Sequence, residues 1–321
     1  MAGTPALGAA GLAEPAAPPA PAALAQEIAR LMQGFSVETT PPELARLRSL
    51  PAELTRASRV YITWIPSSRF EHMLRAAVHL RELGMTPVPH LAVRAIADAA
   101  ALETMLAQLR REAAVDDVLL VAGSQRVPSG SLDNTPHALA SGAFERQGLR
   151  CLALAAHPEG SPDIGADALV QALRDKNAHA RQSPLQMRLV TQFCFAAAPI
   201  VDWERAARAD GNRLPMHVGL AGLASLPTLV RYARSCGVGA SLGTLTRQAG
   251  RLFKLTSALP PGEIVVALAR ARLADPACLV ERCHFFPFGS LAATVAWAAR
   301  VAAGDFVLRH DDGDLSVSSA A

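Results

Sequence analysis

The chain has 321 residues, a length that allows one large domain or two ordinary ones. Half of the residues are hydrophobic and 18% are charged, so there is enough apolar material for a sizeable core. The formal net charge of only +3 argues against nucleic-acid binding as the main activity. No uninterrupted apolar run reaches the roughly 18 residues of a membrane span, so we expect a soluble globular protein with no membrane partner.

The two ends of the chain differ in composition from the middle. Residues 1–23 are mostly Ala, Pro and Gly and lack the basic start and strongly apolar core of a secretory signal. They carry too few large apolar side chains to offset the entropy lost on ordering, and we expect a disordered leader. We expect residues 24–307 to form the folded domain and residues 308–321 to form a flexible tail.

The five cysteines are odd in number and include no Cys-X-X-Cys pair. This pattern fits neither a disulfide framework nor a zinc ribbon. They are Cys151, Cys194, Cys236, Cys278 and Cys283. A reducing cytoplasm is therefore the simplest location for the protein.

One unit, a short apolar run followed by a helix-like segment, repeats along the chain. The runs do not alternate between apolar and polar residues, which is typical of strands buried on both faces. In chain order the runs are Gly34–Thr39, Arg59–Ile65, Thr86–Val93, Asp116–Gly123, Arg150–His157, Met187–Phe195, Leu214–Gly222 and Cys283–Gly289. Apolar positions spaced by three and four predict helices over Phe70–Leu83, Ile96–Arg111, Asp167–Arg181 and Leu226–Cys236.

Roughly eight strand–helix repeats in this length predict a (β/α)8 TIM barrel. The alternative, a doubly wound open sheet, needs a Gly-rich phosphate turn after its first strand. The first run here ends instead in Glu-Thr-Thr-Pro-Pro. The stretch Leu223–Arg282 is too long for one helix, and we expect extra helices between strands seven and eight, including Ser241–Leu255 and Gly262–Leu273.

Barrels of this kind build their sites at the C-terminal ends of the strands. The residues at those ends are Glu38, Thr63, Trp64, His90, Gly123, Ser124, His157, Glu159, Gln192, Gly222, Phe286 and Phe288. Glu38 is either a partly desolvated carboxylate, whose raised pKa would suit a general acid, or a cap on the next helix. Gln192 lies in an otherwise apolar strand, and a buried amide needs a specific partner, so we expect a ligand contact.

The remaining titratable residues argue against two kinds of chemistry. His90 and His157 end their strands, but the chain has no HxH or HExxH pair, so we predict no metal site. His217 and His284 fall early in their runs, and we interpret both as structural. The lysines Lys176 and Lys254 both lie in helical segments, which disfavours Schiff-base catalysis.

These strand-end residues resemble those of the methylenetetrahydrofolate reductase family, from about Gly34 to Ala303. The resemblance rests on the order and spacing of five segments. They are Phe35–Glu38, Val88–Leu91, His157–Gly160, Thr191–Phe193 and His284–Phe288. The family consists of flavin-containing barrels that reduce 5,10-methylenetetrahydrofolate to 5-methyltetrahydrofolate with NADH or NADPH.

The resemblance implies roles for particular residues. Glu38 matches the family's general acid, and Gln192 matches the glutamine that hydrogen-bonds the pterin. The residues matched to contacts with FAD are Thr63, His90, Gly123, His157 and Lys176. Ser124 is assigned a catalytic role together with Glu38 and Gln192, and Phe286 is assigned a substrate-binding role together with Gln192.

The sequence departs from the family pattern at the end of strand four. The family typically has Arg-Gly-Asp there, whereas this chain has Ala122-Gly123-Ser124 and so lacks both charges. His157 stands where a tyrosine is common, and Ser161 where a histidine is expected. Three outcomes stay open: the chain binds flavin weakly, binds it differently, or does not bind it.

We therefore carry three hypotheses for function. The first is a methylenetetrahydrofolate reductase of one-carbon metabolism and methionine biosynthesis, with a folate substrate and NAD(P)H as co-substrate. The alternative is a flavin-free folate-binding barrel that delivers a one-carbon folate to a partner enzyme. The third is an unrelated barrel enzyme such as a lyase. No residue distinguishes NADH from NADPH, and a homo-oligomer is compatible with the sequence.

Overall fold

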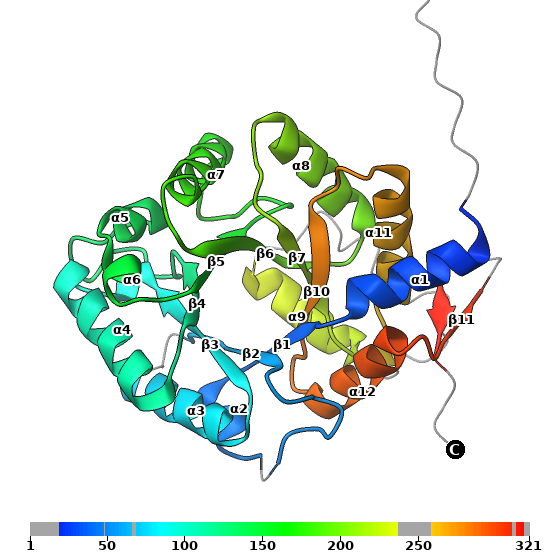
Figure 1. Ribbon diagram of the computed structural model, residues 1–321, viewed down its shortest axis with the longest axis horizontal. Coiled ribbons are helices and arrows are strands. Elements are labelled where there is room, and N and C mark those ends of the chain that lie inside the picture. The colour runs from blue at the N-terminus through cyan, green and yellow to red at the C-terminus, as the bar shows by residue number, and fades with distance from the viewer. Residues whose placement is uncertain (1–18, 48, 66–68, 237–257, 310–312, 318–321) are drawn as a thin grey trace, which may run out of the picture.

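The computed structural model describes residues 19–47, 49–65, 69–236, 258–309 and 313–317. At its centre is a closed barrel of eight parallel strands in the order β1-β10-β7-β6-β5-β4-β3-β2, with helices on its outside (Figure 1). The strands are β1 (Ser36–Thr39), β2 (Arg59–Ile62), β3 (Thr86–Ala92), β4 (Asp117–Val121), β5 (Cys151–Ala156), β6 (Gln186–Cys194), β7 (Met216–Ala221) and β10 (Val280–Phe286). The predicted (β/α)8 barrel is confirmed.

The helices that follow the strands form the outer layer. They are α2 (Pro41–Leu44), α3 (Phe70–Glu82), α4 (Ala99–Ala113), α5 (Thr135–Ala140), α6 (Ala143–Arg146), α7 (Ala166–Ala180), α8 (Ala197–Ala209) and α12 (Leu291–Ala302), with a 3-10 turn η1 (Val93–Ala95) before α4. Helix α4 begins three residues later than Ile96, where the prediction placed its start. The reason is Asp98, whose side chain accepts a hydrogen bond from the backbone N–H of Ala101 and so caps the helix.

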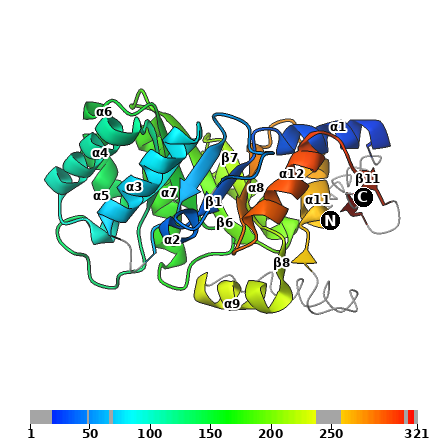
Figure 2. The same ribbon diagram turned by 90° about the horizontal axis from the view of Figure 1, so that it is seen from below.

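Extra elements lie between β7 and β10, as predicted. They are β8 (Ala224–Ser225), α9 (Leu226–Cys236), β9 (Ala258–Leu259) and α11 (Gly262–Ala274). Helix α9 lies across one end of the barrel (Figure 2), where its Leu229 and Ala233 pack against Phe193 and Phe195 of β6 and the loop after it. The helix predicted over Ser241–Leu255, which includes Lys254, lies outside the described residues.

The strands separate an inner cluster of side chains from a larger outer one. Inside the barrel, Tyr61, Val88, Leu119, Ala153 and Val190 pack together, one from each of five strands. Their strand neighbours point outward and join the core under the helices. On β1 the outward residue is Val37, so the side chains on either side of it face the interior.

A buried ion pair lies inside the barrel and contacts Tyr61 of the inner cluster. Arg188 of β6 donates to both carboxylate oxygens of Asp117 on β4, at 3.0 and 2.8 Å, and to the hydroxyl of Tyr61 at 2.7 Å. The side chains of Arg188 and Asp117 are only 8% and 2% exposed. Arg59 adds a third hydrogen bond to Asp117 at 3.1 Å. The charges of Arg188 and Asp117 compensate one another in the barrel interior, where both side chains are almost fully buried.

Strands β6 and β7 approach each other closely at Gly219. The register of the two strands shifts between Val190 and Phe193. A Cβ on Gly219 would overlap the backbone carbonyl oxygens of Thr191 and Gln192. We expect Gly219→Ala to lower the free energy of unfolding by about 1–3 kcal/mol, because the strands must separate to admit a methyl group.

Chemical denaturation measures this loss, with Gly165→Ala as the matched control. A Cβ on Gly165 would meet nothing within 4 Å, and the residue has φ −62°. The control should change the free energy of unfolding by less than about 1 kcal/mol. Equal effects of the two substitutions would contradict the close approach at Gly219.

Both ends of the domain extend further than the sequence suggests. Helix α1 (Pro21–Met32) begins inside the stretch that we expected to be a leader, and residues 1–18 lie outside the described ones. Within the expected tail, β12 (Leu315–Ser316) pairs with β11 (Val307–Leu308), and Leu315 is buried in the main core. Pairing of β12 with β11 places Leu315 against α11, which adds apolar contacts to a segment that has few apolar residues. None of the described helices is long and apolar enough to cross a membrane.

Candidate functional site

A largely buried carboxylate, Glu38, lies at the C-terminal end of β1, with 12% of its side chain exposed. One of its oxygens accepts a hydrogen bond from the Thr63 hydroxyl at 3.0 Å. The other lies 3.4 Å from Nε2 of His284 and 3.6 Å from Nε2 of His90. These residues come from β10, β1, β3 and the end of β2, which are neighbours in the barrel order. Glu38, Thr63, His90 and His284 are called the carboxylate cluster below.

His284 is held in place by a second contact on its other nitrogen. Nδ1 of the ring lies 2.9 Å from the hydroxyl of Ser36, and the ring packs 4.5 Å from that of Tyr61. A hydroxyl that donates to Nδ1 leaves the proton on Nε2, which then donates to Glu38. The interpretation of His284 as structural stays a prediction, but its expected place early in the strand is corrected. Strand β10 begins at Val280, three residues before the predicted start, so His284 lies in its C-terminal half.

The pKa of Glu38 is lowered, contrary to our expectation that it would be raised. Burial by itself raises the pKa of this carboxyl, but the hydrogen bond from His284, the charges of His90 and His284 and the Thr63 hydroxyl outweigh it. Burial also lowers the pKa of His90 to about 4. At neutral pH the cluster therefore holds an ionised Glu38 beside a neutral His90. The alternative role of Glu38 as a helix cap is also wrong, because Thr40 and Glu43 cap α2.

A row of aromatic rings continues from the carboxylate cluster to α9. The ring of Phe286 lies 4.9 Å from that of His284, and Phe193 lies 5.5 Å from Phe286. Phe288 follows at 5.0 Å from Phe193, and Tyr232 of α9 stacks on it at 4.3 Å. These four residues, Phe193, Phe286, Phe288 and Tyr232, form the aromatic wall. Phe193 and Tyr232 were not among the predicted site residues.

Gln192 lies in the same layer of the barrel as these groups. Its neighbour Phe193 is paired with Gly219, which is paired in turn with His284. The amide oxygen of Gln192 is buried and has no hydrogen-bond partner among the described residues. A buried polar atom normally has a hydrogen-bond partner, so this oxygen is an exception among the described residues. The contacts of the described residues do not join Gln192 to Glu38 directly.

The end of β4 contributes little to the cluster. Ser124 is exposed, and no contact of the described residues brings it to Glu38. Gly123 has φ +92°, and a Cβ there would lie 3.2 Å from the Cβ of Ala92. The structure thus places Gly123 and Ser124 near the mouth of the barrel without joining them to the group that contains Glu38.

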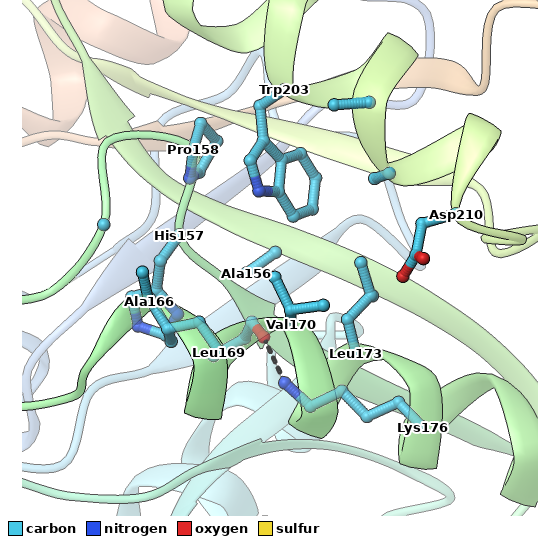
Figure 3. Close-up of a pocket in the computed structure, with 14 residues that line it drawn as sticks. Ala156, His157, Pro158, Ala166, Leu169, Val170, Leu173, Lys176, Trp203 and Asp210 are labelled. Atoms are coloured by element: carbon cyan, nitrogen blue, oxygen red, sulfur yellow. Dashed lines mark hydrogen bonds between the residues drawn. The ribbon is translucent and has the colours of Figure 1, made fainter.

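The residues that the resemblance matches to flavin contacts are divided between two places. Thr63 and His90 are engaged by Glu38 in the barrel mouth. His157 and Lys176 instead line a separate cavity between α7 and α8, against β5 (Figure 3). The described residues therefore do not bring these four positions to one place.

Other donor sets are also absent from the part of the chain that the structure describes. No three His, Cys, Asp or Glu side chains among those residues converge to hold a metal ion. Cys151, Cys194, Cys278 and Cys283 are free thiols. Burial, aided by Glu159, raises the pKa of Cys194, and burial raises that of Cys283 to about 12, so neither is a thiolate at neutral pH.

The buried histidines predict a pH dependence of stability. Burial lowers the pKa of His90 and of His217 to about 4, below the value of about 6.5 in an unfolded chain. Between these values the unfolded state binds protons that the folded state does not, so stability falls as pH falls. Each residue contributes up to about 1.4 kcal/mol per pH unit.

Urea denaturation at a series of pH values measures this slope. Between about pH 6.5 and pH 4, the free energy of unfolding of His217→Gln should depend less steeply on pH than that of the wild type, by the contribution of one histidine. Above about pH 7 the two slopes should be equal. A variant whose slope equals that of the wild type over the acid range would contradict the low pKa of His217.

Comparisons with known proteins support the fold. No protein-family model matches the chain. Among solved structures, it is similar to a protein from Clostridium thermocellum that binds two copies of 5-methyl-5,6,7,8-tetrahydrofolic acid. The identity is 12% and the TM-score 0.53, over 87% of this chain and 99% of that chain. At this identity the similarity shows a shared fold.

Other solved structures match with lower scores. A 2,3-dimethylmalate lyase of the PEP mutase/isocitrate lyase superfamily has 11% identity and a TM-score of 0.44, over 85% of this chain and 84% of that chain. The carboxyl transferase domain of Rhizobium etli pyruvate carboxylase has 11% identity and a TM-score of 0.42. That match covers 87% of this chain and 48% of the other.

Proposed function

We propose that the chain binds a reduced folate in the mouth of the barrel and reduces its 5,10-methylene form to 5-methyltetrahydrofolate with a nicotinamide hydride. The observation that carries this proposal is the ionised carboxylate of Glu38 beside the aromatic wall. The folate bound by the Clostridium thermocellum protein of the same fold supports the choice of ligand.

The pterin ring of a folate has chemistry that these groups complement. One edge of the ring carries an amino group and an adjacent N–H, which match the two oxygens of a carboxylate such as Glu38. The flat faces of the ring suit packing against Phe286 and its neighbours in the aromatic wall. The buried amide of Gln192 offers a further polar contact to the ring.

The reaction places a positive charge on the pterin ring whose amino edge Glu38 binds in this proposal. The methylene bridge of the substrate opens when its outer nitrogen takes up a proton from solvent, which leaves an iminium cation at the inner nitrogen. A fixed anion nearby stabilises this cation. A hydride from NADH or NADPH then adds to the iminium carbon and completes the methyl group, so one proton and one hydride are consumed for each NAD(P)+ released. In this scheme Glu38 acts through its charge, because its lowered pKa keeps it deprotonated at neutral pH.

Two measurements test the proposal on the purified full-length chain. Isothermal titration calorimetry should show binding of 5-methyltetrahydrofolate. Mixing the protein with 5,10-methylenetetrahydrofolate and either nicotinamide, without added flavin, should then yield 5-methyltetrahydrofolate, which mass spectrometry detects. Absence of folate binding would overturn the proposal.

A second candidate is a folate-binding barrel that carries the one-carbon unit without reducing it. The segment Ala122-Gly123-Ser124 favours this candidate, because it has neither the arginine nor the aspartate of the Arg-Gly-Asp pattern that the family typically has there. This candidate predicts folate binding that depends on Glu38 and no turnover with either nicotinamide. The two functions are therefore separated by the same pair of measurements.

A further inference from the structure

A cavity of about 410 Å³ opens between helices α7 and α8, outside the barrel wall (Figure 3). We call it the α7–α8 cavity. Its walls are mainly apolar. The larger side chains that line it are Leu169, Val170 and Leu173 of α7 and Trp203 of α8. A cavity of this size is in the range that holds a small organic molecule.

One buried charge lies in this apolar cavity. Lys176 lines it and is only 7% exposed. Its ammonium donates to the backbone carbonyl of Ala155 at 2.7 Å. Among the described residues it makes no other hydrogen bond and has no carboxylate within ion-pair distance. Buried ammonium groups are normally paired, since an isolated charge is strongly disfavoured away from water.

The other titratable groups of the cavity do not compensate this charge. Asp210 also lines the cavity, but both of its oxygens accept hydrogen bonds from Arg174, at 2.9 and 2.6 Å. Burial, together with the charge of Lys176, lowers the pKa of His157 to about 4. Burial lowers the pKa of Lys176 itself to about 8. At neutral pH the cavity therefore holds one ammonium, a neutral His157 and a carboxylate that is already paired.

We propose that the α7–α8 cavity binds a small organic anion, with a planar apolar body and one carboxylate or sulfonate group, at a site distinct from the folate site. The anionic group pairs with the free N–H groups of Lys176. The apolar body packs between the leucines of α7 and the indole of Trp203, which faces Lys176 across the cavity in Figure 3. None of the residues that form this site takes part in the proposed reduction of folate.

Two fluorescent probes of the same shape test the proposal. 8-Anilinonaphthalene-1-sulfonate carries a sulfonate, and N-phenyl-1-naphthylamine has the same rings without it. The wild type should bind the sulfonate at least about tenfold more tightly, and Lys176→Met should abolish that preference by weakening only the sulfonate. Arg181→Met removes an exposed charge just beyond the same helix and should leave both affinities unchanged.

Two further variants locate the bound probe. Ala206→Phe fills the cavity from an exposed position on α8 and should reduce binding of both probes. Glu38→Gln should leave both unchanged, and 5-methyltetrahydrofolate should not displace the sulfonate. Binding of the sulfonate should weaken above about pH 8, as Lys176 loses its proton. Equal binding of the two probes, no effect of Lys176→Met, or displacement by the folate would each overturn the proposal.

Discussion

Replacing Glu38 with glutamine should weaken the binding of 5-methyltetrahydrofolate by about 100-fold. Glutamine keeps the shape of the side chain and its contact with Thr63, but it removes the negative charge. The carboxylate can accept two charge-assisted hydrogen bonds from the pterin edge. The amide of glutamine accepts only one neutral hydrogen bond, and its NH2 group then faces a second N–H donor of the pterin. A loss of this size corresponds to about 2.7 kcal/mol of binding free energy.

The chain offers a matched control for this substitution. Glu281 lies on β10, the strand next to β1, and also faces a histidine, His217, at 3.5 Å, but it lies near the N-terminal end of its strand. Glu281→Gln should leave the affinity for the folate unchanged in the same calorimetric titration. If both variants bound the folate as tightly as the wild type, the carboxylate cluster would not be the pterin site.

Replacing Asp117 with alanine should lower the free energy of unfolding by about 3–5 kcal/mol. The substitution leaves the guanidinium of Arg188 buried without its carboxylate, and an uncompensated charge in the barrel interior is strongly destabilising. Guanidinium chloride denaturation followed by circular dichroism measures the loss. The double variant Asp117→Ala with Arg188→Met should recover part of the stability, because no charge is then left unpaired.

The neighbouring residue provides the control for Asp117. Asp116 pairs with Arg150, whose side chain is 79% exposed, so Asp116→Ala should lower the free energy of unfolding by less than about 1 kcal/mol. Losses of equal size for Asp116→Ala and Asp117→Ala would show that the interior ion pair does not hold the barrel together.

The barrel could be predicted from the sequence because its strands are buried on both faces. Such strands appear as uninterrupted apolar runs, and eight of these runs alternate with amphipathic segments. Details set by single side chains or by pairing were harder to predict. The cap at Asp98 makes α4 begin three residues later than predicted. Pairing of β12 with β11 gives part of the predicted tail a regular structure.

The candidate site was predicted less completely, because its geometry depends on residues far apart in the chain. Glu38, Thr63 and His90 could be selected as strand ends, since strand ends converge at one mouth. His284 is separated from Glu38 by 246 positions, and their contact depends on where β10 begins. The direction of the pKa shift of Glu38 depends on that contact in turn. No pattern in the sequence indicated that Lys176 would lie in a cavity outside the barrel wall.

The most direct test of the account follows a deuterium label during turnover. The protein is mixed with 5,10-methylenetetrahydrofolate and with NADH or NADPH in which both hydrogens of the hydride-donating carbon are deuterium, without added flavin. Direct transfer in the barrel mouth predicts 5-methyltetrahydrofolate with one deuterium in its methyl group, and no such product from Glu38→Gln. A hydride held by a flavin exchanges with water before transfer. Unlabelled product, a requirement for added FAD, or no product from protein that binds the folate would contradict the proposed reaction.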